Sequence, residues 1–381
     1  MSNIPAGYQQ TDIGLIPSDW EVITIDEILN FVGGSQPPRD NFIFDEKEGY
    51  VRLLQIRDYK TDRYASYIPS HLARKKCDKD DIMIGRYGPP IFQILRGLEG
   101  AYNVALIKAI PKQNITREFG WFILNQETLF DFVEKLSQRS SGQTGVDLNE
   151  LKKYQIPFPP TKAEQTAIST ALSDADMYIS SLEKLIAKKQ AIKQGAMQQL
   201  LTPKADWVVK KLGEVAEIYT GKRNNQDKVE DGAYPFFVRS QDVERINSYS
   251  FDGEAILIPG EGGIGNIFHY INGKFDYHQR VYKISDFAEG YSARFIFFFM
   301  KEHFGKEAMK NSVKATVDSL RLPTFTEYEI PFPSINDQTH IATILSDMDA
   351  EIATLEKQLA KARSIKQGMM QQLLTGKIRL I

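Results

Sequence analysis

Side chains that can read the edges of nucleic acid bases occur in two matched groups along the chain. The first group is Gln55, Arg57, Asp58, Arg86 and Tyr87, and the second is Arg239, Ser240, Gln241, Asp242 and Asn266. Arginine suits guanine, glutamine suits adenine, and aspartate can accept a hydrogen bond from cytosine N4. Further donors for phosphates or bases are Lys222, Arg223, His278, Arg280, Gln143, Thr144, Lys314 and Thr316. Each residue alone is better explained by a solvated loop, but two matched sets favour binding to double-stranded DNA.

Motifs for covalent chemistry are absent from the sequence. It contains no Gly-x-x-x-x-Gly-Lys-Ser/Thr phosphate loop and no Asn/Asp-Pro-Pro-Tyr/Phe motif for amino methylation. The glycine-rich segment 260–267 fits a tight turn, or a loop that approaches DNA, better than a cofactor loop. Five scattered histidines and one cysteine lack the spacing of zinc ligands. We therefore expect no catalytic site, no metal and no cofactor in this chain.

Two pairs of carboxylates resemble metal ligands by spacing alone. They are Asp174 with Asp176 and Asp347 with Asp349. Residues two apart on a helix point to different faces. We therefore predict that these acids are solvated or ion-paired rather than metal-binding.

The elements that must position the base-reading residues are set by an internal repeat. Residues 156–202 and 330–376 have nearly the same sequence, so that Gln165 corresponds to Gln338. Each copy begins with Pro-Phe-Pro and a capping pattern, from Thr161 in the first copy and from Ser334 in the second. Each copy therefore predicts one helix of roughly 40 residues, about 60 Å long.

The apolar residues of each predicted helix recur at alternating steps of four and three, as in a coiled-coil seam. They are Ile168, Leu172, Ile179, Leu182, Ile186 and Leu200, then Ile341, Leu345, Met348, Ile352, Leu355, Leu359 and Leu373. We expect an antiparallel helix pair with a pseudo-twofold axis; the alternative is that each helix packs separately on a globular domain. Gly195 and Gly368 interrupt both copies at one position, which predicts close approach of a helix or a partner subunit, or else tolerated drift.

The repeat extends beyond the helices and predicts the order domain, helix, domain, helix. Apolar segments at 51–57, 82–84, 234–239 and 256–258 are typical of strands, and 119–136 and 293–309 of helices, so each domain is mixed α/β. The net charge is −2, and a free-standing DNA-binding protein would be more basic. One cysteine, no membrane-spanning run and no signal peptide predict a soluble cytoplasmic protein.

Three segments together resemble the specificity subunit of type I restriction-modification systems. They are residues 7–20, the Ile-Pro-Phe-Pro segments before both helices, and residues 371–377. The resemblance implies an α/β (mixed α+β) fold with two similar target-recognition domains and an antiparallel coiled coil. Its parts would be residues 1–158 (first domain with the N-terminal segment), 159–203 (first spacer helix), 204–332 (second domain) and 333–381 (second spacer helix and tail).

The resemblance also implies a function. Each domain would read one half of a bipartite, asymmetric DNA site, while the helices would set the spacer and dock two modification (methyltransferase) subunits. Restriction (ATPase/endonuclease) subunits would join through the complex, which would be a DNA adenine methyltransferase and an ATP-dependent endonuclease. The complex, rather than this non-catalytic chain, would use S-adenosylmethionine, ATP and Mg²⁺. Two alternatives are a coiled-coil scaffold with two protein-binding domains and no DNA readout, and an enzyme with an unrecognised site.

Overall fold

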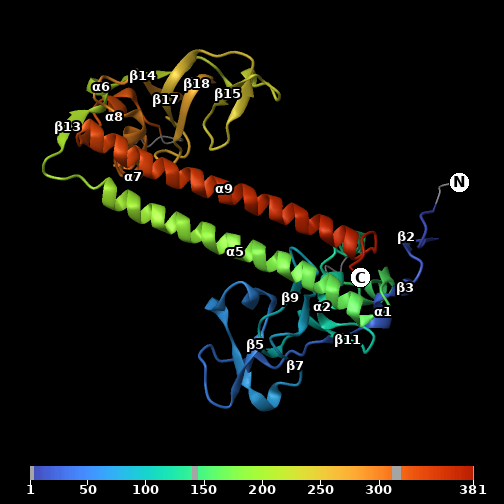
Figure 1. The fold of residues 1–381 in the computed structure, drawn as a ribbon. Coiled ribbons are helices and arrows are strands. Elements are labelled where there is room, and N and C mark those ends of the chain that lie inside the picture. The colour runs from blue at the N-terminus through green and yellow to red at the C-terminus, as the bar shows by residue number, and fades with distance from the viewer. Residues whose placement is uncertain (1–3, 140–144, 311–318, 381) are drawn as a thin grey trace. The chain divides into compact units, whose positions relative to one another are not determined.

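The computed structural model describes residues 4–139, 145–310 and 319–380, and the chain divides into two units (Figure 1). The first unit comprises residues 1–181 and 359–381, and the second comprises residues 182–358. Each unit contains one globular domain and segments of both long helices, α5 (Lys162–Leu200) and α9 (Ile335–Leu373). Both helices have 39 residues, so the two predicted long helices are confirmed.

The first unit holds two four-stranded sheets and two separate strand pairs. One sheet has the order β4 (Leu29–Gly33), β11 (Leu106–Pro111), β8 (Ile82–Gly85), β9 (Gln93–Leu95), and the other β6 (Tyr67–Pro69), β5 (Tyr50–Leu54), β10 (Gly100–Tyr102), β7 (Lys76–Cys77). β1 (Tyr8–Thr11) pairs with β2 (Gly14–Pro17), and β3 (Glu21–Thr24) with β12 (Gln155–Phe158). The helices are α1 (Ile25–Ile28), α2 (Arg117–Leu124), α3 (Glu127–Arg139) and α4 (Leu148–Lys153).

The second unit is built around one six-stranded sheet. Its order is β14 (Glu217–Thr220), β19 (Val281–Ser285), β17 (Phe251–Pro259), β18 (His269–Tyr277), β15 (Tyr234–Phe237), β16 (Glu244–Ile246). β13 (Val208–Lys211) pairs separately with β20 (Glu329–Phe332). The helices are α6 (Leu212–Val215), α7 (Ala293–Lys310) and α8 (Leu322–Thr326). Gly253 and Gly273 face each other across β17 and β18 with φ of 153° and 144°, where side chains are rarely tolerated, so the glycines let this hairpin bend.

The prediction of one continuous helix over residues 119–136 is wrong. The segment predicted as a helix over 119–136 forms two helices, α2 and α3, which are separated at Asn125 and Gln126. The Asn125 side chain donates a hydrogen bond from Nδ2 to the carbonyl of Trp121 over 2.8 Å. An asparagine that binds the preceding turn in this way competes with the continuing helix. The helix predicted over 293–309 is confirmed as α7.

Ion pairs orient the long helices in each unit. In the first unit Lys366 of α9 contacts Asp176 of α5 over 2.5 Å. In the second unit Lys193 of α5 contacts Asp349 of α9, and Lys189 contacts Glu351 over 2.6 Å. From Lys193 back to Lys189 on α5, the paired residue on α9 moves forward from Asp349 to Glu351. These segments of the two helices are therefore antiparallel. Asp176 and Asp349, and likewise Lys193 and Lys366, are repeat equivalents, so the prediction that these two acids are solvated or ion-paired is confirmed.

The seam residues near the helix ends pack mainly on the globular domains. Ile168 and Leu172 are fully buried in the core of the first unit, which also contains Phe119 and Leu373. In the second unit, Leu345 is buried in the core that contains Phe295. Both packing modes expected from the sequence therefore occur in one structure, and a coiled-coil supercoil stays a prediction.

The expected close approach of another helix at the two glycines is wrong for the part of the chain that the structure describes. A Cβ atom built on Gly195 or on Gly368 has no atom within 4 Å. Both positions therefore face open space, and close approach of a partner subunit stays a prediction.

A buried glutamine attaches each long helix to its globular domain. Gln165 is fully buried; its Oε1 accepts from the Thr116 amide over 2.8 Å, and its Nε2 donates to the carbonyls of Asn114 and Pro159. Thr116 is the N-cap residue of α2, which lies in the core of the domain. The side chain therefore joins the first turn of α5 to the start of a core helix.

Gln338 makes the same three contacts in the second unit. Its Oε1 accepts from the Ser292 amide over 2.9 Å, and its Nε2 donates to the carbonyls of Gly290 and Pro333. The residue is 2% exposed, and Ser292 in turn accepts a hydrogen bond from the Phe295 amide at the start of α7. The same attachment is thus built twice from repeat-equivalent residues.

Replacing either glutamine by alanine is expected to loosen its own unit alone. Each substitution removes the partner of one backbone amide and two backbone carbonyls that are partly or fully buried, and it lowers the free energy of unfolding by about 1–3 kcal/mol. Hydrogen exchange should show faster exchange of the Thr116 amide in Gln165→Ala and of the Ser292 amide in Gln338→Ala. The exposed Gln198→Ala is the control. Unchanged exchange at the matching amide would contradict this role.

Candidate nucleic-acid interface

In the first unit, two of the base-reading candidates, Gln55 and Arg57, line one cleft. Its volume is about 600 Å³, and its lining includes Gln36, Arg39, Phe42, Gln55, Arg57 and Asn103. Gln55 directly follows β5, and Arg57 is exposed in the next turn with its guanidinium 5.3 Å from the Tyr64 ring centre. Gln36 and Arg39 lie in the proline-containing loop after β4 and were missed by sequence analysis.

Asp58 does not suit base contact. It is 3% exposed, and its Oδ2 accepts a hydrogen bond from the Gln55 amide over 2.7 Å, which caps the turn formed by residues 56–59. Burial raises the pKa of this carboxyl, although the Gln55 amide and the charges of Arg52 and Arg57 oppose the shift. The prediction that Asp58 reads a base is therefore corrected to a structural role, in which it shapes the loop that carries Gln55 and Arg57.

Arg86 and Tyr87 follow β8 and lie together. The Arg86 guanidinium is 5.6 Å from the centre of the Tyr87 ring, and Tyr87 is 42% exposed. Arg86 Nε is enclosed and has no hydrogen-bond partner among the described residues. Of the remaining candidates, Gln143, Thr144, Lys314 and Thr316 lie outside the residues that the structure describes.

In the second unit, Arg223 is committed to a buried carboxylate. Its Nε contacts Asp276 over 3.2 Å, and Asp276 is 1% exposed. Asp276 also accepts hydrogen bonds from the hydroxyls of Ser248 and Ser250 and from the Tyr277 amide. Arg223 therefore fixes the loop after β14, while the neighbouring Lys222 is exposed.

The other candidates of the second unit are mainly exposed and lie at strand ends. Arg239 and Arg280 are exposed, and both contact Glu261, which sequence analysis did not identify. Gln241, Asp242 and Asn266 are exposed. Ser240 is half-buried, and its hydroxyl donates to the Asp242 carbonyl over 2.8 Å.

His278 is 5% exposed and holds the turn that carries Arg280. Its Nδ1 accepts a hydrogen bond from the Arg280 amide over 3.0 Å. Burial, followed by the positive charges of Arg239 and Arg280, lowers the pKa of the imidazole below its usual range. The ring is therefore neutral near pH 7, and its place is structural rather than in direct contact with a base.

The two domains build the same corner from different residues. This corner is the point where the chain leaves one of two parallel neighbouring strands. In the first domain the amide of Asn103, which follows β10, donates to the carbonyl of Leu54 at the end of β5. In the second domain the amide of His278, which follows β18, donates to the carbonyl of Phe237 at the end of β15. The Asn103 side chain accepts from the Ala105 amide over 3.0 Å, two residues ahead, as His278 does from Arg280.

A glycine passes close to this corner in each domain. A Cβ on Gly34 would lie 1.9 Å from the Asn103 carbonyl oxygen, and one on Gly221 would lie 2.1 Å from that of Tyr277. Only glycine fits at such distances. The two glycines have equivalent places in the repeat, which is the signal that could have identified this corner from sequence.

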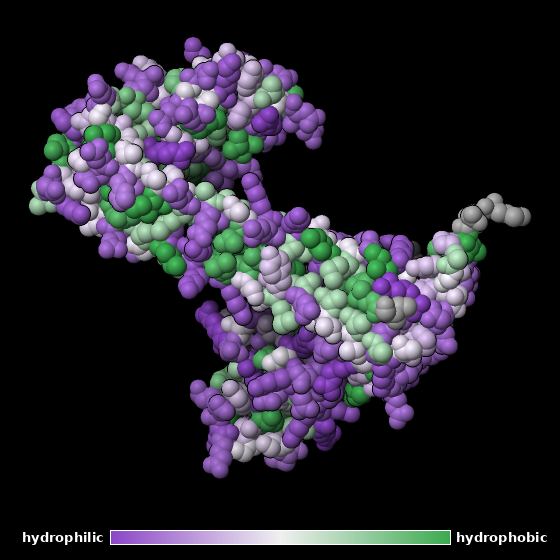
Figure 2. All heavy atoms as spheres, in the orientation of Figure 1, coloured by the Kyte–Doolittle hydropathy of each residue, from purple (hydrophilic) through white to green (hydrophobic). Residues whose placement is uncertain are grey.

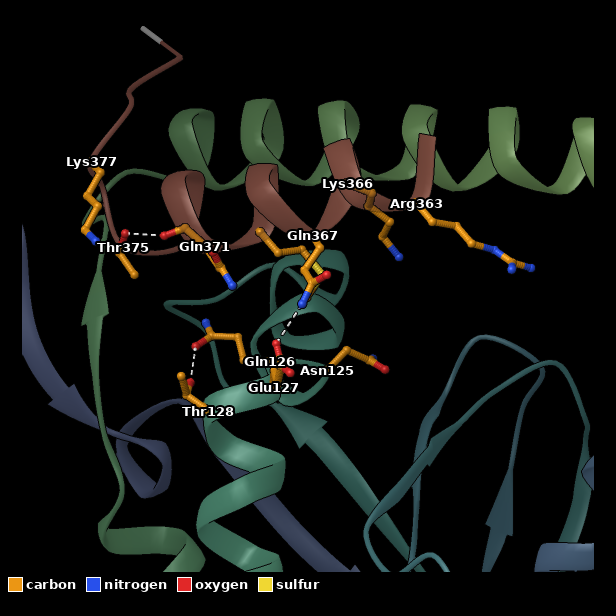
Figure 3. Close-up of a pocket in the computed structure, with 11 residues that line it drawn as sticks. Asn125, Gln126, Glu127, Thr128, Arg363, Lys366, Gln367, Gln371, Thr375 and Lys377 are labelled. Atoms are coloured by element: carbon orange, nitrogen blue, oxygen red, sulfur yellow. Dashed lines mark hydrogen bonds between the residues drawn. The ribbon is translucent and has the colours of Figure 1, made fainter. Parts of the chain in front are cut away.

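A second type of cleft, at the junction of helix and domain, is found in both units. In the first unit it measures about 510 Å³ and lies between the α2–α3 junction and the end of α9 (Figure 3). Gln367 donates to Glu127 there over 2.9 Å. The cleft of the second unit measures about 590 Å³, and there Gln194 donates to Glu302 over 3.2 Å. Gln367 and Gln194 are repeat equivalents, so each cleft contains the same kind of glutamine–glutamate hydrogen bond.

Neither a metal site nor a membrane span is found in the described part of the chain. No group of three or more histidine, cysteine, aspartate or glutamate side chains in residues 4–139, 145–310 and 319–380 could hold a metal ion. Within the same ranges, every helix is too short or too polar to cross a membrane.

Comparison with known proteins gives consistent results over nearly the whole chain. The family model described as type I restriction modification DNA specificity domain matches twice, at residues 17–194 and 204–363. The chain is 26% identical to the type I restriction enzyme MjaVIII specificity subunit of Methanocaldococcus jannaschii, over 96% of this chain and 94% of that protein. It is 31% identical to the EcoDI specificity subunit of Escherichia coli over 45% of this chain and 37% of that protein.

A solved structure has the same fold. The crystal structure of the type I restriction-modification S subunit from M. genitalium matches with a TM-score of 0.65, over 93% of this chain and 96% of that chain. Sequence identity in that match is 17%, so the match bears on the fold alone. It agrees with the mixed α/β fold predicted from the sequence.

Because His278 is neutral in the folded protein, we expect the stability of the second unit to depend on pH. Because its pKa is lowered in the folded state, the unfolded chain binds a proton first as the pH falls below about 6.5. The second unit should therefore lose stability below that pH. His278→Asn, which copies Asn103, keeps an acceptor and removes the titration, so its stability should fall less between pH 6.5 and pH 5. Thermal unfolding of both proteins across this range measures the difference, and parallel curves would contradict it.

Proposed function

The chain belongs to the type I restriction-modification DNA specificity domain family, and we propose that each of its two globular domains reads one half of a split, asymmetric DNA site. The family and the relatives indicate a specificity subunit, whose role is recognition of a DNA target. In this proposal the chain binds DNA and performs no covalent chemistry. Methyl transfer from S-adenosylmethionine and ATP-dependent, Mg²⁺-dependent cleavage belong to the modification and restriction subunits of the complex.

The main support for this proposal is that both domains share one backbone arrangement at their strand ends but present different side chains there. Both domains have the same corner at their parallel strand ends, held by Asn103 in one and by His278 in the other. Around it the first domain presents Gln55 and Arg57, whereas the second presents Arg239 and Arg280. Different donors on equivalent strand ends would recognise different bases, which explains why the two halves of the site would differ.

Near-neutral charge also fits this role. A net charge of −2 supplies little of the phosphate attraction that dominates DNA affinity. The specificity subunit would therefore grip DNA together with its partner subunits and contribute mainly the selection of bases.

Exchanging residues 21–155 for the equivalent domain of another specificity subunit should change one half of the recognised site. The other half and the spacer should stay as they were, because the second domain and both helices are unaltered. Mapping of methylated motifs by sequencing, in a host that carries the whole system, measures this. A change in both halves would contradict independent reading, and an unchanged site would favour a scaffold whose domains bind protein.

We further propose that the exposed helix face around each interrupting glycine docks one modification subunit. Residues 192–202 and 365–375 are identical except at one position, although several of them face solvent. Ile192 is 47% exposed and Ile365 is 53% exposed. Hydrophobic residues are also visible at the surface along the long helices (Figure 2). Folding alone does not require identical exposed residues in two copies, whereas binding the same partner twice does.

The glycines support the same proposal. Gly195 and Gly368 each cost about 1 kcal/mol of helix stability relative to alanine, and within the described structure they have open space beside them. A glycine allows the backbone of a partner to approach closely. Two equivalent faces would bind two copies of one partner, which matches the expectation of two modification subunits.

Replacing these glycines by leucine should change the stoichiometry of the complex. Leucine favours the helix, so folding is retained, but its side chain blocks close approach. We expect two modification subunits on the wild-type chain, one on Gly195→Leu or Gly368→Leu, and none on the double variant, as measured by mass photometry. The exposed pair Thr170→Leu and Thr343→Leu is the control. Two bound subunits on the double glycine variant would place docking elsewhere.

A further inference from the structure

A carboxylate lies between two exposed arginines at the strand ends of the second domain. Glu261 Oε2 is 3.3 Å from Arg239 Nη1, and Glu261 Oε1 is 3.5 Å from Arg280 Nη1. The side chains of Arg239 and Arg280 are 43% and 58% exposed, whereas that of Glu261 is 22% exposed. Each carboxylate oxygen therefore faces one guanidinium, and most of the arginine donors remain open to solvent.

The backbone beneath this cluster is fixed on both sides. The Gly260 amide donates to the Arg280 carbonyl over 2.8 Å, and the Gly260 carbonyl accepts from the Leu320 amide over 2.7 Å. A Cβ on Gly260 would lie 2.7 Å from the Tyr282 ring, so glycine is required directly before Glu261. Glu261 therefore starts from a rigid position, and its carboxylate can define where the two guanidinium groups lie.

Stability alone does not account for this arrangement. Ion pairs between side chains this exposed contribute little to folding, because solvent screens them. A carboxylate close to DNA also repels phosphates, so it would weaken binding unless it had another effect. Holding two guanidinium groups in place is such an effect, since the two positive charges would otherwise repel each other and move apart. Each guanidinium has five donors, and Glu261 accepts a hydrogen bond from Arg239 and forms an ion pair with Arg280.

The equivalent position in the first domain also contacts an arginine. Glu261 forms a backbone bridge with Ser319, and Tyr87 forms the corresponding bridge with Gly145. The Tyr87 ring lies 5.6 Å from the Arg86 guanidinium. The same strand end thus carries a side chain that orients an arginine in both domains, by an aromatic ring in one and by a carboxylate in the other.

We propose that Glu261 is a positioning residue for base recognition, which holds Arg239 and Arg280 at a fixed separation so that both can bind guanines of the second half-site. The proposal rests on DNA recognition by this domain and names the chemistry of one part of the site. Arginine binds the O6 and N7 atoms of guanine in the major groove through two parallel hydrogen bonds. Such a contact depends strongly on the orientation of the guanidinium plane, which is what the carboxylate restricts.

The test uses the assembled complex and a library of duplexes randomised in both half-sites. Glu261→Gln should lower discrimination for guanine at the affected positions about tenfold. Binding to unrelated DNA should become stronger, because one negative charge near the phosphates is removed. The first half-site is an internal control and should stay unchanged. Glu289→Gln removes an exposed negative charge from the same domain and should leave both half-sites as they were.

A second comparison separates positioning from direct contact. In the variant that carries both Arg239→Ala and Arg280→Ala, adding Glu261→Gln should change base preference no further, because the residue acts through the two arginines. Further change in that background would show that Glu261 reads a base itself and would overturn the proposal. Unchanged guanine preference in the single Glu261→Gln variant, with its thermal unfolding equal to wild type, would also overturn it.

These outcomes differ from failure of the proposed function itself. If the second domain did not read DNA, the wild-type complex would show no base preference in the second half-site, and none of the substitutions could alter it. A preference that is present in the wild type but independent of Glu261 would leave DNA recognition intact and refute only the positioning role.

Discussion

The attachment of a long helix to a recognition domain depends on one buried glutamine side chain in each unit. Gln165 and Gln338 each satisfy one backbone amide and two backbone carbonyls, and these groups belong to two segments, one directly before a core helix and one directly before the long helix. A polar side chain with no water around it must make all of these bonds, since each unpaired buried group is costly. The geometry is therefore restricted to one arrangement. The orientation of the reading loops relative to the helix that follows each domain is fixed by this constraint.

The charge distribution of the second domain is restrained in a similar way. Arg223 is held by the buried Asp276, and Arg239 and Arg280 are held by Glu261. Cations that are paired with carboxylates add less to general DNA affinity than free lysines do, but their orientation is better defined. A chain with net charge −2 is therefore suited to selecting bases, and in the proposed complex the partner subunits would contribute most of the phosphate attraction.

Sequence analysis predicted the parts of the structure that depend on local patterns or on the repeat. The long helices follow from caps and periodicity, and ion pairing of Asp176 and Asp349 follows from helical geometry. Roles that depend on distant partners were missed. Gln165 was noticed only as a landmark of the repeat, and Asp58 was assigned to base reading because a cap and a base contact require the same residue type. The role of Glu261 could not be predicted from the sequence, because it depends on contacts with two arginines that are distant in sequence and meet it only in the folded protein.

Comparison of the two repeat copies separates two kinds of surface. Where exposed residues are the same in both copies, as at Gly195 and Gly368, the two units present the same chemistry and suit two copies of one partner. Where equivalent strand ends carry different residues, as at Tyr87 and Glu261, they suit two different DNA half-sites. Buried positions are uninformative in this comparison, because packing alone can keep them alike. Under the proposed function, the internal repeat would thus distinguish surfaces for partner docking from surfaces for DNA reading, since each function places an opposite demand on the symmetry of the surface.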